Sequence, residues 1–287
     1  ATVVDASGLN LGASTVGGNL IATATTGNME DAGVLTIAGT SSFTTSATDA
    51  TITLNNANAF TGAVSLNTTG SSGNATVVDA SDLNLGASTV GGNLIATATT
   101  GNMTDSGALT IAGTSSFTTS ANNATIALNT TNNAFTGAVT ITTNDNSGTD
   151  ADVRIDGGTT ALILAASTID GNLTVISGNA SGITDSGTVT VGGILSAVTD
   201  ANSGVINLDS LAVDAGIHLR THGTGDATAV NDAGLGFGAG GSTVGGNLIA
   251  TATTGNLWDY GSLTVGGTTT LTTSATNADI ILNNANA

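Results

Sequence analysis

The chain has 287 residues, of which 41 are Gly, while Pro and Cys are absent and only 2% are aromatic. Acidic residues number 20 against 2 basic ones, so the net charge of −18 repels phosphate backbones and argues against nucleic-acid binding. The absence of Cys excludes disulfides and thiolate metal sites, and the longest apolar run, residues 161–166, is too short for membrane insertion as a helix.

The first feature met along the chain is a segment that recurs. The run GNLIATATTGN occupies residues 18–28 and returns at 92–102 and 246–256. Aligning the copies gives four repeat units that begin at Ala1, Ala75, Ala151 and Ala227: 1–74, 75–150, 151–226 and the truncated 227–287. Such repetition predicts one continuous solenoid over residues 1–287. Because the pattern stops within a unit, we expect the sequence to be an excerpt of a longer chain.

Short β-type runs follow one another within the first unit. They occupy residues 9–11, 18–25, 34–39, 42–47, 50–55 and 62–67. Apolar and small polar residues alternate in these runs with a period of two, and Gly, Asn or Asp separates one run from the next. No stretch has helical periodicity framed by caps. The pattern therefore predicts an all-β chain.

Repetition favours a parallel β-helix (β-solenoid) over a sandwich or barrel, which closes once and has no need to repeat. Coils of roughly 17–25 residues would stack about 4.8 Å apart, so a repeat of 74–76 residues holds three to four coils. Val, Ile, Leu and Ala then fill a narrow core, and Thr, Ser and Asn face solvent. Gly and Asn suit the corners because both tolerate the left-handed backbone conformation.

Acidic residues recur at unit spacing rather than in one cluster. Four stand in D-x-G triplets and four near the heads of the units: Asp31, Asp105, Asp185 and Asp259, then Asp5, Asp79, Asp156 and Asp232. In D-x-G we expect each carboxylate to bind the backbone of its own turn. Calcium is the cofactor that such positions could take, although the calcium-binding β-roll nonapeptide is missing.

The segment GIHLRTHG at 216–223 holds both His residues of the chain. On a strand, His218, Arg220 and His222 point outward, and the two His lie about 13 Å apart, too far to share a metal. Their counterparts in the first unit are Ser65, Asn67 and Thr69. Two interpretations stand here: a contact for a small anion or carboxylate, and drift on a tolerant surface.

Trp258 and Tyr260 replace Glu30 and Ala32 of the first unit. We expect both rings on an exposed corner, on the same side of the backbone. Exposed aromatic rings stack on sugars or anchor a partner. Covering a neighbouring loop is the alternative.

Outward hydroxyl and amide side chains form a further candidate surface. In the first unit they are Thr23, Thr25, Thr44, Ser46, Thr48, Ser65, Asn67 and Thr69. Flat arrays of this kind suit ice or crystalline polysaccharide. Unequal coil lengths argue against ice, which requires a regular spacing.

Three sequence elements resemble a known group of proteins: GNLIATATTGN, the ITDSG or MTDSG turn followed by TVTVGG or LTIAG, and NAFTGAV at 58–64 and 133–139. They are similar to the repeats of filamentous-haemagglutinin-like adhesins and related β-strand-repeat exoproteins of bacteria. This resemblance implies a right-handed β-helix and an extracellular, cell-surface location.

These observations together lead to a functional hypothesis. Ionisable residues are spread at unit spacing, so we expect no enzyme but a structural or adhesive fibre segment of a bacterial surface protein. Its partners would be further copies, joined along the solenoid axis into filaments, and a glycan or a host or neighbouring cell surface. The alternative is a surface-binding module that uses the Thr, Ser and Asn arrays on polysaccharide or ice.

Overall fold

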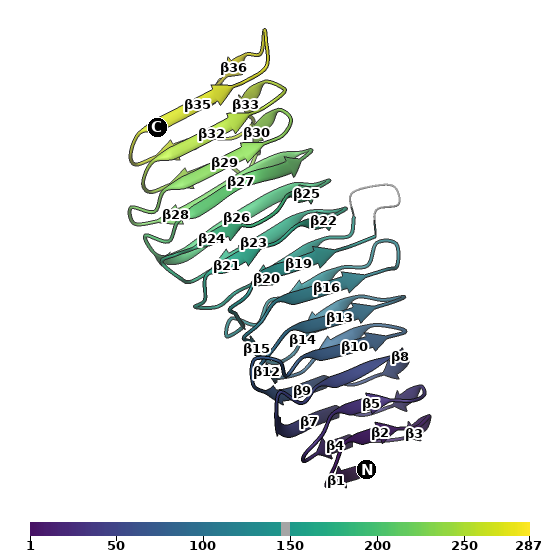
Figure 1. The fold of residues 1–287 in the computed structure, drawn as a ribbon. Coiled ribbons are helices and arrows are strands. Elements are labelled where there is room, and N and C mark those ends of the chain that lie inside the picture. Colours follow the sequence, from purple (N-terminus) through teal and green to yellow (C-terminus); the bar gives the residue numbers. More distant parts are fainter. Residues whose placement is uncertain (145–149) are drawn as a thin grey trace. The chain divides into compact units, whose positions relative to one another are not determined.

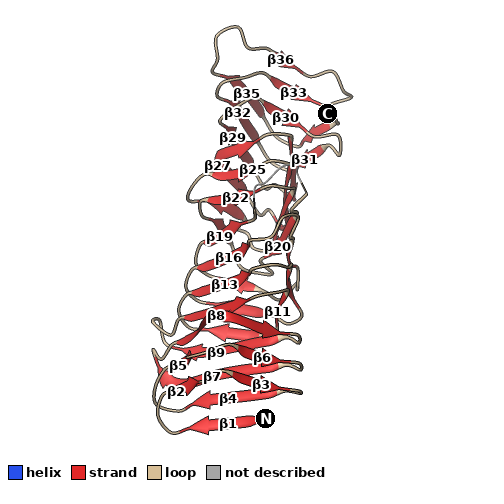
Figure 2. Cartoon of the chain, turned by 90° about the vertical axis from the view of Figure 1, so that its right-hand side faces the viewer, coloured by secondary structure: helices blue, strands red, loops and turns tan. Residues whose placement is uncertain are grey.

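The computed structural model describes residues 1–144 and 150–287, without the side chains of residues 201 and 202. Its regular elements in these residues are 36 strands, joined by turns and loops alone (Figure 2). No helix in the described ranges is long and apolar enough to cross a membrane. The chain divides into two compact units, residues 1–144 and 145–287, and each forms its own stack of coils.

Unit 1 contains strands β1 to β19, arranged on two faces. The β1 face comprises β1 (Thr2–Asp5), β4 (Leu20–Ala24), β7 (Ser41–Thr48), β9 (Val64–Thr69), β11 (Leu83–Leu85), β12 (Ser88–Val90), β14 (Met103–Asp105), β15 (Leu109–Ile111), β17 (Ile126–Leu128) and β18 (Ala134–Phe135). The β2 face comprises β2 (Leu9–Leu11), β3 (Ser14–Val16), β5 (Met29–Asp31), β6 (Leu35–Ile37), β8 (Ile52–Phe60), β10 (Ala75–Asp79), β13 (Leu94–Ala98), β16 (Ser115–Thr119) and β19 (Val139–Thr142).

Unit 2 contains strands β20 to β36 in the same kind of arrangement. The β20 face comprises β20 (Val153–Asp156), β23 (Leu173–Ser177), β26 (Ile194–Asn202), β28 (Gly216–His222), β30 (Leu235–Phe237), β31 (Ser242–Val244), β33 (Leu257–Asp259), β34 (Leu263–Val265) and β36 (Ile280–Ile281). The β21 face comprises β21 (Leu162–Leu164), β22 (Ser167–Ile169), β24 (Ile183–Asp185), β25 (Val189–Val191), β27 (Ile206–Val213), β29 (Ala227–Asn231), β32 (Leu248–Ala252) and β35 (Thr269–Thr273).

Neighbouring strands run parallel, and each coil places its strands on those of the coil before it. Within unit 1, Thr2 pairs with Ile21 and Ser115 pairs with Val139, so one turn of the chain separates the members of each pair. Figure 1 shows the resulting ladder, with β2, β5, β8, β10, β13, β16 and β19 in ascending order. The spacing of these pairs falls within the predicted coil length, and the expected all-β solenoid is confirmed.

Each coil has one straight side and one bent side. The straight side is a single strand such as β4, and the bent side is a pair of short strands such as β5 and β6, separated by a bend at residues 32–34. Alternate residues of all three strands point inward, as Leu20, Ala22 and Ala24 do in β4. The strand period of two thus places the apolar half of each run in the core.

A repeat does not contain a whole number of coils. One column on the β1 face rises through three coils: Thr2, Ile21, Ser42 and Ser65. Thr76, the counterpart of Thr2 one period later, lies on the opposite face above Thr53. The first repeat therefore spans three and a half coils, and the second repeat presents the same sequence on the other face.

The exchange of faces takes place at particular strands. In unit 1 the straight strand β9 pairs with both short strands of the following coil, through Val64 to Leu85 and Asn67 to Thr89. In unit 2 the long strand β27 pairs with β24 and β25 on one side and with β29 on the other. Both units therefore swap their straight and bent sides once per repeat.

Aspartates of the D-x-G triplets connect successive coils. The Asp31 carboxylate accepts hydrogen bonds from the backbone N–H of Asn55 (3.0 Å) and from Nδ2 of the fully buried Asn58 (2.7 Å). Asn58 Oδ1 in turn accepts from the Leu35 N–H. The donors to Asp31 therefore lie one coil further along the chain and not in its own turn, where the D-x-G pattern had suggested them.

Candidate functional site

The strip formed by His218, Arg220 and His222 lies on β28 as predicted, with Ile217 and Leu219 pointing into the core. Arg220 and His222 are exposed, and His218 is half-buried. His222 Nδ1 lies 2.6 Å from the Thr199 carbonyl, which fixes this nitrogen as the protonated donor. The His222 side chain is otherwise exposed, as Arg220 is two residues earlier on the same strand.

The ring of His218 rests on glycines of the next coil. A side chain at Gly238 would place its Cβ 2.1 Å from His218 Nε2, and one at Gly240 would meet the ring at 2.8 Å. The Gly240 N–H donates to His218 Nε2 at 3.3 Å, which leaves Nδ1 as the N–H donor. Burial and, to a smaller extent, the Arg220 guanidinium lower the pKa of His218.

The bend above His218 is also longer than its counterpart in the first repeat. GLGFGAGGSTV at 234–244 contains two more residues than GLNLGASTV at 8–16. The additional glycines include Gly241, whose φ of +72° lies in the left-handed region that favours glycine. The bend of repeat 4 therefore contains several glycines at the place where it contacts the His218 ring of repeat 3.

Trp258 lies on β33 and not on an exposed corner, which corrects the prediction for this residue. Its indole is half-buried and covers the backbone of the preceding coil, where a Cβ at Gly234 or Gly236 would come within 2.6 or 2.5 Å of the ring. Tyr260 is 63% exposed, and its ring meets Trp258 edge to face with centroids 6.1 Å apart. Trp258 thus covers a neighbouring segment, and Tyr260 is the ring that is exposed on the surface.

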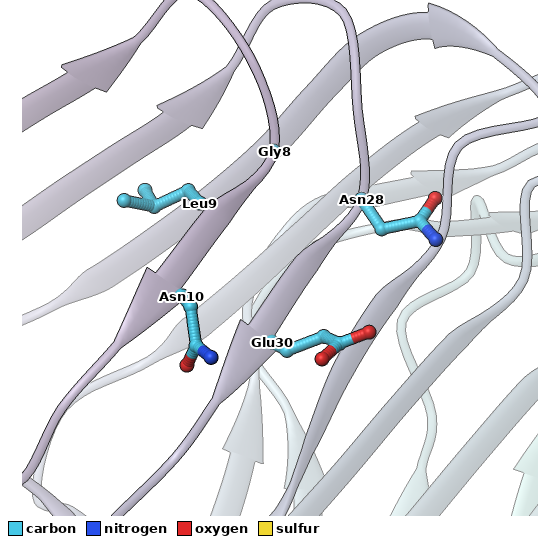
Figure 3. A pocket seen from close by; sticks show the side chains of 5 residues that line it. All are labelled: Gly8, Leu9, Asn10, Asn28 and Glu30. Atoms are coloured by element: carbon cyan, nitrogen blue, oxygen red, sulfur yellow. The ribbon is translucent and has the colours of Figure 1, made fainter.

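The first repeat has an open hollow at the position of Trp258. This shallow pocket is lined by Gly8, Leu9, Asn10, Asn28 and Glu30 (Figure 3). Asn10 and Glu30 project to one side of their strands and Leu9 to the other. In repeat 4 the counterparts of Asn10 and Glu30 are Gly236 and Trp258, so the indole fills the space that the first repeat leaves empty.

The two predicted patches converge on the β20 face of unit 2. Ile217, Phe237 and Asp259 form one inward column, so the residues that follow them, His218, Gly238 and Tyr260, form the adjoining outward column. By strand spacing, His218 and Tyr260 are about 10 Å apart, with only glycine between them. Arg220 lies two residues further along β28, below Thr243. We call His218, Arg220, Trp258 and Tyr260 the aromatic–cationic patch.

The hydroxyl array of the first repeat is outward, as predicted, but some of its hydroxyl groups form hydrogen bonds within the fold. Thr23, Thr44 and Asn67 form one column on the β1 face. The Thr25 hydroxyl donates to the Asp5 carbonyl at 2.6 Å, and the exposed Ser46 and Thr48 lie toward the end of β7. The adjacent outward column includes Ile21, which is 49% exposed and interrupts the polar surface.

Aspartates near the heads of the units occupy less regular positions than expected. Asp5 and Asp79 are equivalent, and each accepts a hydrogen bond from the N–H two residues on, at 2.8 Å from Ser7 and 2.9 Å from Ser81. The strand register places Asn231, not Asp232, at the same position, since Val230 and Asn231 pair with β32 as Val78 and Asp79 pair with β13. Asp156 likewise corresponds to Val78.

The described part of the chain contains no group of three or more His, Asp or Glu side chains that could hold a metal ion. A hollow on the β21 face brings Asp209 and Asp232 together with Thr188, Ser210 and Thr253. Its lining thus combines two carboxylates with hydroxyl groups. These residues include no His, Lys or Arg.

Two features of the site were missed in the sequence. The glycines at 236, 238 and 240 looked like ordinary bend residues, but they are the positions that admit the rings of Trp258 and His218. Arg154 also lies on the β20 face, in the column that leads through Thr174 and Ser196 to His218. Comparison of each residue with its counterpart in the other repeats is the signal that could have found both.

Parallel coils, repeat-spaced exchange of faces and coil-to-coil Asp and Asn contacts define a β-solenoid repeat protein. The sequence matches the family described as "Repeats of unknown function (DUF5649)" over four segments: residues 1–67, 72–142, 150–216 and 224–287. The chain belongs to this family of repeats. Neither the curated proteins nor the solved structures contain a match to the chain.

Proposed function

We propose that this chain is a non-enzymatic structural segment of an extracellular bacterial surface protein, in which stacked repeats act as a fibre or stalk. The observation that carries the proposal is the use of recurring polar side chains to hold one coil to the next. Asp31 and Asp105 accept from the backbone of the following coil, and Asn19 and Asn93 accept from Thr40 and Thr114 there. Residues used in this way add length without adding a reaction centre.

The repeats are also suited to extension. Residues after position 74 begin with ATVVDAS, as the chain itself does at position 1, so one unit can follow another without a linker. Open strand edges at the ends of a coil stack are templates for further coils, and the proposal therefore includes association along the solenoid axis. A glycan or another cell surface is the proposed target of the adhesive role.

Duplication of one repeat tests the structural role. A second copy of residues 1–74 inserted before the first should add three and a half coils, or about 17 Å at about 4.8 Å per coil, to the maximum dimension measured by small-angle X-ray scattering. Thermal stability should be unchanged or higher, because each added coil supplies its own interface. A duplicated chain of unchanged length, or one that no longer folds, would overturn the proposal.

Surface binding by the hydroxyl array is the second candidate function, supported by the outward column of Thr23, Thr44 and Asn67. Antifreeze activity or retention on crystalline polysaccharide would support this alternative. Substituting Thr23 and Thr44 by Val should then abolish retention, because the hydroxyl groups are removed while the shape is nearly kept.

A further inference from the structure

The aromatic–cationic patch combines an exposed ring, a half-buried ring and an arginine. Tyr260 is 63% exposed, and Trp258 contacts its ring edge to face. Rings held in this way supply apolar contact at a low cost in side-chain entropy, because the neighbouring ring already limits their motion. The patch is thus a rigid surface for a flat, partly apolar ligand face.

The Arg and His residues of the chain are gathered on the same face. Arg154, Arg220, His218 and His222 are all of the Arg, Lys and His residues, and all lie on outward positions of the β20 face of unit 2. Among the described residues, no ion pair involves Arg220. In a chain of net charge −18, an arginine kept free of carboxylates is available to an anion from outside.

Comparison with the other repeats shows that the patch is a combination of changes. Arg220 stands where Asn67 and Thr142 stand, Tyr260 where Ser106 and Ser186 stand, and Trp258 where Thr104 and Thr184 stand. Glycines make room for two of the rings, as a Cβ at Gly236 or Gly238 would overlap Trp258 or His218. Independent neutral substitutions do not by themselves explain why each of these two rings lies against a glycine of an adjacent coil.

We propose that the aromatic–cationic patch binds a sugar that carries one carboxylate. The apolar face of the sugar ring lies on Tyr260, and the carboxylate meets the Arg220 guanidinium. One carboxylate suits the site better than a highly charged polyanion, because the net charge of the chain repels dense negative charge. This proposal rests on the proposed adhesive role, for which it names the class of glycan, but it does not depend on the proposed role as a fibre or stalk.

The chain provides its own probe, since Trp258 is its one Trp residue. Titration of the intact protein with sialyllactose, or with galacturonate, each of which carries one carboxylate, should produce a saturable change in Trp258 fluorescence in the millimolar range. Lactose, which lacks the carboxylate, should bind at least about tenfold more weakly, the difference expected for one charge-assisted hydrogen bond. Response to one acidic sugar alone identifies the kind of acid that the patch accepts.

Variants copied from other repeats separate binding from folding. Arg220→Thr and Tyr260→Ser should each weaken binding by about tenfold, without lowering the unfolding temperature, because both side chains are exposed. Arg154→Thr removes the same charge three coils below His218 and should leave the affinity unchanged.

Equal binding of lactose and the acidic sugars would overturn the role of Arg220. The absence of any fluorescence change, or an equal loss in Arg154→Thr and Arg220→Thr, would overturn the site. Neither result bears on the repeat-duplication experiment, so the binding proposal and the structural role can fail separately.

Discussion

At the scale of single residues, buried Asn and Asp side chains hold the coils together. Asn133 illustrates the arrangement: its Oδ1 accepts from the buried Leu109 N–H at 2.8 Å, and its Nδ2 donates to Asp105 at 2.7 Å. A backbone N–H in the core without a partner carries its full desolvation cost. These amides therefore satisfy the backbone at the bends, where the strand ladder is interrupted.

Replacing Asn133 by Ala should lower the free energy of unfolding by about 1–3 kcal/mol, because the Leu109 N–H loses its acceptor. Urea denaturation measures the change. The neighbouring Asn132 is exposed, so Asn132→Ala serves as the matched control and should alter stability by less than about 0.5 kcal/mol. Equal effects at the two positions would contradict the role assigned to Asn133.

Asp79 and Asp5 should respond to pH in opposite directions although they are equivalent in the repeats. Burial raises the pKa of Asp79 above that of the unfolded chain, so its contribution to stability increases as the pH falls through the raised pKa. The backbone and hydroxyl hydrogen bonds from Ser7 lower the pKa of Asp5, so its contribution is lost as the pH falls through the lowered value.

Asp79→Asn and Asp5→Asn allow this difference to be measured. Between pH 7 and 4, the stability of Asp79→Asn relative to the unmodified chain should decrease, because the protonated Asp79 no longer carries a buried charge. The relative stability of Asp5→Asn should instead increase as the pH is lowered further, below the ordinary Asp pKa of 3.8. Urea midpoints at several pH values give both slopes, and slopes of the same sign would contradict the assignment.

At the scale of elements, a pair of buried Phe side chains joins the two faces in each of the first two repeats. Phe117 on β16 and Phe135 on β18 are fully buried, with ring centroids 5.7 Å apart and an interplanar angle of 73°. Phe43 and Phe60 form the same pair in the first repeat, at 5.8 Å. In the third repeat Ala197 and Val213 occupy the two positions, so both rings are replaced together.

A double-mutant cycle should show that the rings act as a pair. Phe117→Ala is expected to cost about 3–5 kcal/mol, as is usual for a buried aromatic residue. The double variant Phe117→Ala with Phe135→Val should cost about 0.5–1.5 kcal/mol less than the sum of the single changes, since the edge-to-face contact is lost only once. Additive effects in urea denaturation would show that the rings are not coupled.

The direction in which strand side chains point, and therefore their burial, could be predicted from the sequence, because both depend on the local period of two residues. Alternation in LIATA places Leu20, Ala22 and Ala24 inward, and the structure agrees. The partners of Asp31 could not be found in this way, because D-x-G is also a local turn signal and its donors, Asn55 and Asn56, lie on the following coil. Similarly, nothing near Trp258 in the sequence indicates that Gly236 of the preceding coil accommodates its ring.

At the scale of the whole molecule, charge should govern association between chains. A net charge of −18 repels neighbouring copies at low ionic strength, and salt or calcium screens this repulsion. Sedimentation velocity should therefore show little self-association at low salt in the presence of a chelator, and more with added calcium. Tight assemblies that persist at low salt with chelator would contradict this expectation.

The central structural claim is that a repeat spans three and a half coils, so that consecutive repeats show the same sequence on opposite faces. The sequence predicted three to four coils but could not fix the fraction, because the coil length varies along the chain, as the pairs Thr2–Ile21 and Ser115–Val139 show. Because consecutive repeats lie on opposite faces, each unit exposes two copies of a repeated surface segment, one on each face.

Paired cysteines at the exchange of faces test this claim most directly, because the chain has no Cys of its own. Asn67 and Thr89 are partners on adjacent strands, so Asn67→Cys with Thr89→Cys should form a disulfide in the folded protein. Ser65 and Thr76 lie on opposite faces, so Ser65→Cys with Thr76→Cys should remain reduced under the same mild oxidation. A whole number of coils would place Thr76 on the same face as Ser65, and efficient formation of that second disulfide, with failure of the first, would contradict the account.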